Sequence, residues 1–181
     1  FIESFLDALQ IESVRIAGLS MGGFAAARFA AENSGRVERL ALLDSAGLGR
    51  DLPWGFRLSS LPVLKHLLTR PQRWLHERFF VAAEVEHPYA QHNDAYLKYA
   101  FEVTRNDGHA LAVRHNMPVF AGIRGQRNLL SDEELAEIRA ATLVIWGEQD
   151  RFFPLDHAHR AVSAIPNSKL EVLPNSGHIV L

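Results

Sequence analysis

The chain passes from a strand-like run to a helix-like run within ten residues, Val14-Arg15-Ile16-Ala17-Gly18-Leu19-Ser20-Met21-Gly22-Gly23. The first part is typical of a short apolar strand, and the alanine-rich residues 24–31 that follow are typical of a helix. Ser20 has a glycine two residues before it and another two residues after it, which is the G-x-S-x-G pattern. A turn this abrupt requires a positive φ at its central residue. It also requires glycine at the flanking positions, because only glycine lets the two backbone segments approach each other so closely. We therefore expect Ser20 to stand clear of a sheet, beside a helix N-terminus that favours negative charge.

The composition excludes several classes of function. The chain has 181 residues, 48% of them hydrophobic, and a formal net charge of −2, which suits one substantial globular core. No basic run indicates a nucleic-acid partner, and no apolar run approaches the ~20 residues that a membrane span needs. The absence of cysteine excludes disulfides and thiolate ligands. Eight of the nine histidines, all but His178, lack ligand-type spacing with partners, so we expect neither a metal nor a cofactor.

Strand and helix patterns alternate at both ends of the chain. This rhythm predicts an α/β fold, with a mostly parallel sheet and helices on both faces. The expected strands are the run before Ser20 and residues 40–43, 142–146 and 169–173. The expected helices beside the sheet are residues 1–10, 24–31 and 155–164.

The middle of the chain breaks this rhythm. From Gly47 to about Ala140 no buried strand is evident, and prolines separate short amphipathic segments. These segments predict helices at residues 61–68, 72–80, 94–104, 107–113 and 131–139. We therefore expect two core parts, residues 1–49 and 139–181, and an inserted helical cap at residues 50–138.

Three chemically informative residues follow predicted parallel strands: Ser20, Asp150 and His178. Catalytic residues of open α/β sheets gather at the carboxyl ends of the strands. A serine hydroxyl attacks well only when a base takes its proton, and imidazole suits that task because it titrates near neutrality. An aspartate can hold the ring tautomer and stabilise the imidazolium. The N–H of Met21, directly after the serine, is a candidate oxyanion-hole donor.

Four ordered motifs resemble those of the α/β-hydrolase superfamily: Gly18-Leu19-Ser20-Met21-Gly22-Gly23, Leu42-Leu43-Asp44-Ser45-Ala46-Gly47, Trp146-Gly147-Glu148-Gln149-Asp150 with Pro154, and Asn175-Ser176-Gly177-His178. The resemblance covers nearly the whole chain. It implies that Ser20 is the nucleophile, Asp150 the acid and His178 the base, beneath a mobile cap. It also implies a fragment, because in that family the first strands and the loop with the second oxyanion donor precede the serine turn. A final helix normally follows the histidine.

Alternatives remain for these assignments. Asp44 also ends a predicted strand, where some relatives of the fold place the acid. Ser20 could be incidental to a glycine-rich turn, Asp150 a helix-capping carboxylate and His178 a surface turn residue. Arg114 could meet a substrate carboxylate, although a solvated arginine is the simpler interpretation. Aromatic residues that could line an apolar substrate pocket, or simply pack the cap, are Trp54, Phe79, Phe80, Phe120 and Phe152.

The first function expected from these features is hydrolysis of a carboxylic ester, or a related acyl bond, of a small apolar substrate through an acyl-enzyme. The serine turn and the run from Asp44 to Gly49 also resemble the carbon–carbon hydrolases of aromatic ring-cleavage diketones, which often carry Trp where this chain has Ile179. A non-catalytic ligand receptor that kept the triad is a third hypothesis. The expected partner is a small apolar ester or ketone, with a second copy of the chain as a further candidate, and the expected compartment is the cytoplasm.

Overall fold

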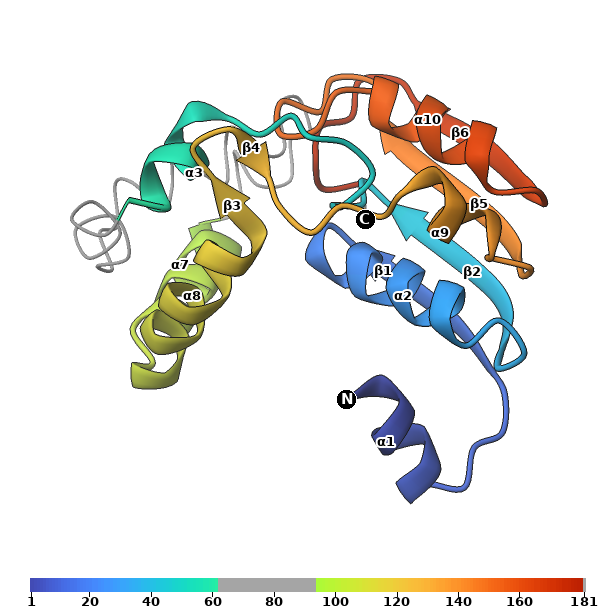
Figure 1. Cartoon of the computed structure of the whole chain (residues 1–181). Coiled ribbons are helices and arrows are strands. Elements are labelled where there is room, and N and C mark those ends of the chain that lie inside the picture. The colour runs from blue at the N-terminus through green and yellow to red at the C-terminus, as the bar shows by residue number, and fades with distance from the viewer. Residues whose placement is uncertain (62–93, 181) are drawn as a thin grey trace.

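The computed structural model describes residues 1–61 and 94–180 (Figure 1). Its centre is a four-stranded sheet in the order β1-β2-β5-β6, and every neighbouring pair of these strands is parallel. The strands are β1 (Val14–Leu19), β2 (Val37–Leu43), β5 (Ala141–Gly147) and β6 (Ser168–Leu173). The predicted α/β fold with a parallel sheet is therefore confirmed. The predicted helix at residues 72–80, and all but the first residue of the one at 61–68, lie outside the described residues.

The register of the strands brings their carboxyl ends to one edge. Leu19 of β1 pairs with Leu43 of β2, and Leu43 pairs with Ile145 of β5. The residues that directly follow β1 and β2 are therefore neighbours. β2 starts three residues before the apolar run that predicted it. Val37 is buried and belongs to the strand, but the exposed side chains of Glu38 and Arg39 separate it from the apolar run in the sequence.

Three helices lie in a row on the face of the sheet that is turned to the viewer in Figure 1. Helix α2 (Met21–Glu32) contacts β1 and β2, and α10 (Asp156–Ala164) contacts β5 and β6. Helix α9 (Asp132–Ala136) contacts both α2 and α10. Small side chains allow the close approach of α2 to the sheet, since Ala26, Ala27 and Ala30 are buried there. The N-terminal helix α1 (Ile2–Ala8) buries Leu6.

Helix α9 begins as its sequence predicts. The Ser131 hydroxyl accepts a hydrogen bond from the Glu134 N–H, and the Glu134 carboxylate accepts one from the Ser131 N–H, which is a capping box. Glu134 also forms an ion pair with Arg28 of α2. Leu135 and Ile138 are fully buried. The last predicted cap helix is thus attached to the helices of the core, whereas the division into core and cap stays a prediction.

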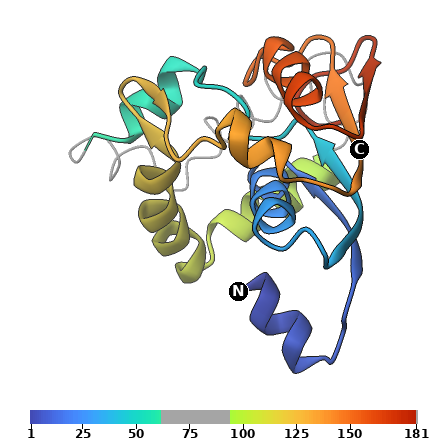
Figure 2. The ribbon, with the colours of Figure 1, turned by 45° about the vertical axis from the view of Figure 1, so that its right-hand side comes forward.

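The other described elements of the inserted segment lie beyond the carboxyl ends of the strands (Figure 1, Figure 2). These elements are α3 (Trp54–Ser59), α7 (Asp94–Thr104), α8 (Asp107–Phe120), β3 (Ala121–Gly122) and β4 (Gly125–Gln126). Helix α8 continues past the predicted end at residue 113 and contains Pro118, which removes one hydrogen bond of its last turn, and the helix stops two residues later. The antiparallel pair of β3 and β4 was not expected, since two-residue strands are too short to show alternation. No helix within the described ranges is both long and apolar enough to cross a membrane.

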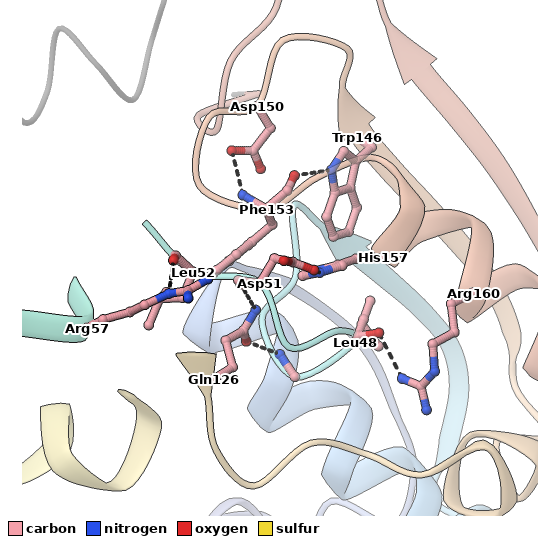
Figure 3. A network of polar contacts seen from close by, with 11 residues as sticks. Leu48, Asp51, Leu52, Arg57, Gln126, Trp146, Asp150, Phe153, His157 and Arg160 are labelled. Carbon is pink, nitrogen blue, oxygen red and sulfur yellow. Dashed lines mark hydrogen bonds and ion pairs between the residues drawn. The ribbon is translucent and has the colours of Figure 1, made fainter. Parts of the chain in front are cut away.

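Polar side chains tie together the two connections that join the inserted segment to the core (Figure 3). The Gln126 amide accepts from the Gly47 N–H at 2.8 Å and donates to the Asp51 carbonyl at 3.0 Å. The Arg160 guanidinium donates to the carbonyls of Leu48 and Leu130, one on each connection, at 2.8 and 2.9 Å. The outgoing and returning chain segments are therefore held side by side against α10.

Candidate active site

Ser20 lies at the turn between β1 and α2, in the conformation that its flanking sequence predicts. Its φ is 54° and its ψ is −118°, a region that a residue with a side chain rarely adopts. Three backbone hydrogen bonds hold the turn: the Ser20 N–H donates to the Leu43 carbonyl at 2.9 Å, and the Ser20 carbonyl accepts from the N–H groups of Phe24 and Ala46 at 3.1 and 3.0 Å. Because α2 starts directly after Ser20, the hydroxyl sits at the positive end of that helix.

The glycines at this turn do not all act as the motif suggests. A Cβ on Gly18 would overlap the backbone of Gly22 and Gly23, and a Cβ on Gly23 would overlap the Ser45 side chain and approach the Gly18 carbonyl oxygen at 2.9 Å. A Cβ on Gly22 would meet no atom within 4 Å. The expectation that both motif glycines are needed for close approach is therefore right for Gly18 and wrong for Gly22. The second tight glycine is Gly23, one residue outside the pattern.

The structure brings Ser20, His178 and Asp150 into one hydrogen-bonded chain. The Nε2 atom of His178 lies 2.9 Å from the Ser20 hydroxyl oxygen, and its Nδ1 atom lies 2.9 Å from Oδ2 of Asp150. The histidine side chain is 7% exposed and the aspartate side chain 1%. The contacts run from the serine hydroxyl to the imidazole and from the imidazole to a buried carboxylate. This is the geometry of an activated serine nucleophile.

The two loops that carry Asp150 and His178 are bound to each other. The Gln149 N–H donates to the Ser176 carbonyl at 2.9 Å, which joins the loop after β5 to the loop after β6. The Oδ1 atom of Asp150 accepts from the N–H groups of Phe152 and Phe153 at 2.6 and 3.1 Å. One carboxylate oxygen is thus fixed by the backbone, and the other is left for the histidine.

Two phenylalanine rings fix the plane of the His178 ring. The ring centroids of Phe152 and Phe153 lie 4.8 and 5.0 Å from that of His178. Phe152 was among the predicted pocket residues, and it is buried against His178. Phe153 was not singled out. The repeated phenylalanine directly after Asp150 and Arg151 is the signal that could have pointed to it.

The remaining predicted residues are one neighbour of Ser20 and several aromatic residues. Met21 is the first residue of α2, where the N–H has no acceptor within the helix, so it stays a candidate oxyanion donor. Phe120 contacts Phe153 edge-on, with 6.3 Å between ring centroids. Trp54 is 65% exposed and lies beneath the Arg57 guanidinium. Phe79 and Phe80 lie outside the described residues, and pocket-lining roles stay predictions.

Asp44, the alternative acid, is close to the triad, but the hydrogen-bond partners of the His178 ring are Asp150 and Ser20. It follows β2 with a φ of 39° and is fully buried. Its Oδ1 atom accepts from the Gly147 N–H at 2.8 Å, whereas Oδ2 is buried without a hydrogen-bond partner. Burial raises the pKa of Asp44 to about 8, and the negative charge of Asp150 acts in the same direction.

Asp44, Asp150 and His178 also present ligand-type atoms within 4.8 Å of one another. A metal ion would need a free ring nitrogen on the histidine. Both ring nitrogens already face hydrogen-bond partners, Ser20 and Asp150. The arrangement therefore fits a proton relay better than a metal site.

Comparison with known proteins gives one consistent family. The family model described as alpha/beta hydrolase fold matches residues 1–181. The 2-hydroxy-6-oxononadienedioate/2-hydroxy-6-oxononatrienedioate hydrolase of Comamonas testosteroni is 30% identical over 185 residues, and the 2-hydroxy-6-oxo-6-phenylhexa-2,4-dienoate hydrolase of the same species is 32% identical over 191. Each match covers 98% of this chain and 60% of the relative, so the chain spans less than two thirds of their length.

Solved structures show the same fold. The meta-cleavage product hydrolase CumD of Pseudomonas fluorescens IP01 superposes with a TM-score of 0.81 at 24% identity, over 98% of this chain and 62% of that one. The carboxylesterase CesB of Bacillus subtilis superposes with a TM-score of 0.68 at 21% identity, over 98% of this chain and 57% of that one.

The unequal glycines predict unequal effects of the same substitution. Gly23→Ala forces a methyl group against Ser45 and the Gly18 carbonyl, and we expect it to lower the free energy of unfolding by about 1–3 kcal/mol. Gly22→Ala is the matched control. It places the methyl group in open space on a helix, where alanine is favoured over glycine by up to about 1 kcal/mol. Urea unfolding followed by circular dichroism measures both, and equal losses would contradict the account of the turn.

The buried Asp44 predicts a particular dependence of stability on pH. The folded protein keeps the Asp44 proton up to about pH 8, whereas the unfolded chain loses it near the ordinary pKa of 3.8. Between these values the native state binds more protons, so the contribution of Asp44 to the free energy of unfolding falls as pH rises, by up to about 1.4 kcal/mol per pH unit. Asp44→Asn removes this dependence. Its stability relative to the parent should grow between about pH 5 and about pH 8 in urea unfolding, and parallel curves would show that native Asp44 is ionised.

Proposed function

Because the chain belongs to the alpha/beta hydrolase family, we propose that it carries the catalytic residues of a serine hydrolase that attacks a carbonyl carbon. The observation that supports this most is the continuous chain of hydrogen-bond contacts from the Ser20 hydroxyl through His178 to Asp150. A binding protein has no need for a serine in a strained turn with a base at 2.9 Å.

The proposed reaction begins with attack by Ser20. As its Oγ atom bonds to the substrate carbonyl carbon, the hydroxyl proton passes to Nε2 of His178. Asp150 accepts the Nδ1–H and stabilises the imidazolium that forms. The carbonyl oxygen becomes an oxyanion, with the Met21 N–H as one donor.

Collapse of this tetrahedral intermediate breaks the bond between the carbonyl carbon and its leaving group, and the imidazolium returns the proton to that group. An acyl ester on Ser20 remains. A water molecule then loses its proton to Nε2 of His178 as its oxygen attacks the ester carbonyl, and collapse releases a carboxylic acid and the free Ser20 hydroxyl.

For the substrate, we propose a conjugated ketone whose carbon–carbon bond beside the carbonyl is cleaved. The relatives are named as hydrolases of 2-hydroxy-6-oxo dienoates. In such a substrate the 6-oxo group is the carbonyl that Ser20 attacks. A proton must first move from the 2-hydroxyl to C5, which gives the 2-oxo tautomer, so that the electron pair of the broken C5–C6 bond is delocalised through the C3–C4 double bond onto the 2-oxo group. The ester that the sequence first suggested becomes the second candidate.

The ester candidate is kept because Ile179 follows His178 where the ring-cleavage hydrolases often carry tryptophan. The rings of Phe152 and Phe56, with centroids 5.4 Å apart, place apolar groups near the histidine that suit either substrate. Both reactions share the acyl-enzyme, so the triad alone does not separate them.

A pair of substrates separates the two candidates. With a 2-hydroxy-6-oxo-6-phenylhexa-2,4-dienoate, loss of the dienoate absorbance reports carbon–carbon cleavage, and with a p-nitrophenyl ester of a short acid, released nitrophenolate reports ester cleavage. We expect a higher kcat/KM for the dienoate, and a fall of at least about 10³-fold for both substrates in Ser20→Ala. A higher kcat/KM for the ester would favour the second candidate. Turnover that survives Ser20→Ala would contradict the serine mechanism itself.

A further inference from the structure

Asp44 is a second buried carboxyl group beside the proposed triad. It directly follows β2, the strand between the one that leads to Ser20 and the one that leads to Asp150. One of its carboxyl oxygens, one of Asp150 and one ring nitrogen of His178 lie within 4.8 Å of one another. Its backbone is held at a φ of 39°, in the left-handed region, by the bond from its N–H to the Ile145 carbonyl at 3.0 Å. The fold thus keeps a strained, fully buried carboxyl group next to the acid of the triad.

The two carboxyl groups have very different hydrogen-bond partners. Asp150 accepts from the N–H groups of Phe152 and Phe153 and faces Nδ1 of His178. Asp44 accepts from one N–H group, that of Gly147, and its Oδ2 atom has no partner. Hydrogen bonds donated to a carboxylate favour its charged form, and an unpartnered buried oxygen disfavours it.

The surroundings supply no positive charge that would let both groups ionise. Within residues 1–61 and 94–180, no lysine or arginine forms an ion pair with either carboxyl group. The titratable group that faces the pair from the loop after β6 is His178, and His157 of α10 stacks on the Phe153 ring, with 6.1 Å between ring centroids. Two adjacent buried carboxyl groups without a cation share one proton.

We propose that Asp44 is a positioning residue of the triad: as a neutral carboxylic acid it donates its proton from Oδ2 to the Asp150 carboxylate. This inference rests on the proposed function. The site then holds a single negative charge, on Asp150, aligned with the Nδ1–H of His178. The burial that raises the pKa of Asp44 to about 8 agrees with this state at neutral pH.

Loss of the Asp44 proton has a definite consequence. The hydrogen bond from Asp44 to Asp150 is then lost and the two carboxylates repel each other, so Asp150 no longer holds the Nδ1–H of His178 in line with Ser20. The reactivity of Ser20 should therefore fall as pH rises through about 8. Asp44→Asn retains a donor toward Asp150 and an acceptor for the Gly147 N–H, but cannot ionise.

The protonation state is tested by carbon-13 NMR of the aspartate carboxyl groups. We expect one signal, absent from Asp44→Asn, that shifts near pH 8 rather than near pH 4. In Asp150→Asn the midpoint of that signal should fall, because the neighbouring negative charge is gone. An Asp44 signal that titrates near the ordinary pKa of 3.8, or one indifferent to Asp150→Asn, would overturn the proposal.

The effect on the triad is tested by the rate at which a fluorophosphonate labels Ser20 as a function of pH. The parent rate should fall above about pH 8, and this fall should be absent from Asp44→Asn. At neutral pH, Asp44→Ala should label at least about tenfold more slowly than Asp44→Asn, because it donates nothing to Asp150. The exposed Asp156→Asn is the control and should keep the parent profile.

A profile of Asp44→Asn that matches the parent would show that Asp44 is merely structural. If the parent itself is not labelled at any pH, the proposed serine chemistry fails, and the NMR titration still decides the Asp44 proposal because it needs no turnover.

Discussion

The close crossing of the backbone at Gly18 and Gly23 is the constraint on which the rest of the site depends. The strand that ends at Leu19 and the helix that starts at Met21 approach so closely that neither glycine has room for a Cβ atom. The crossing leaves Ser20 with a positive φ, a conformation that costs about 1–3 kcal/mol and persists only where its surroundings impose it. Hydrogen bonds to Leu43, Phe24 and Ala46 impose it here. The strain is thus stored at the residue that the proposed chemistry uses.

The parallel sheet brings the other two members of the triad to the same place. β1 and β2 end level with each other, and β5 and β6 end together two residues further on. The loops after β1, β5 and β6 therefore meet at one edge, and residues 158 positions apart come within hydrogen-bond distance. The arrangement is fixed at each step: the backbone holds Asp150, two phenylalanine rings hold His178, and the turn holds Ser20. Such preorganisation lowers the reorganisation that a proton transfer would otherwise require.

The sequence predicts the sheet and its motifs well because they depend on local patterns. Apolar runs placed the strands, and the spacing of glycines around Ser20 indicated the turn. The features it did not predict depend on contacts between distant residues. Gly22 matches the motif but has open space, whereas Gly23 is enclosed by Ser45, which lies on another segment. Phe153 lies at the site because the loop after β5 folds back on His178. No sequence pattern indicates that the Oδ2 atom of Asp44 has no hydrogen-bond partner.

The central claim is that Ser20 is made nucleophilic by His178. The most direct test is the intact mass of the protein after incubation with a fluorophosphonate, in parallel with Ser20→Ala and His178→Ala. The account predicts one adduct on the parent, none on Ser20→Ala, and labelling slowed by at least about 10³-fold in His178→Ala. Unmodified parent protein, or an adduct that survives in Ser20→Ala, would contradict it.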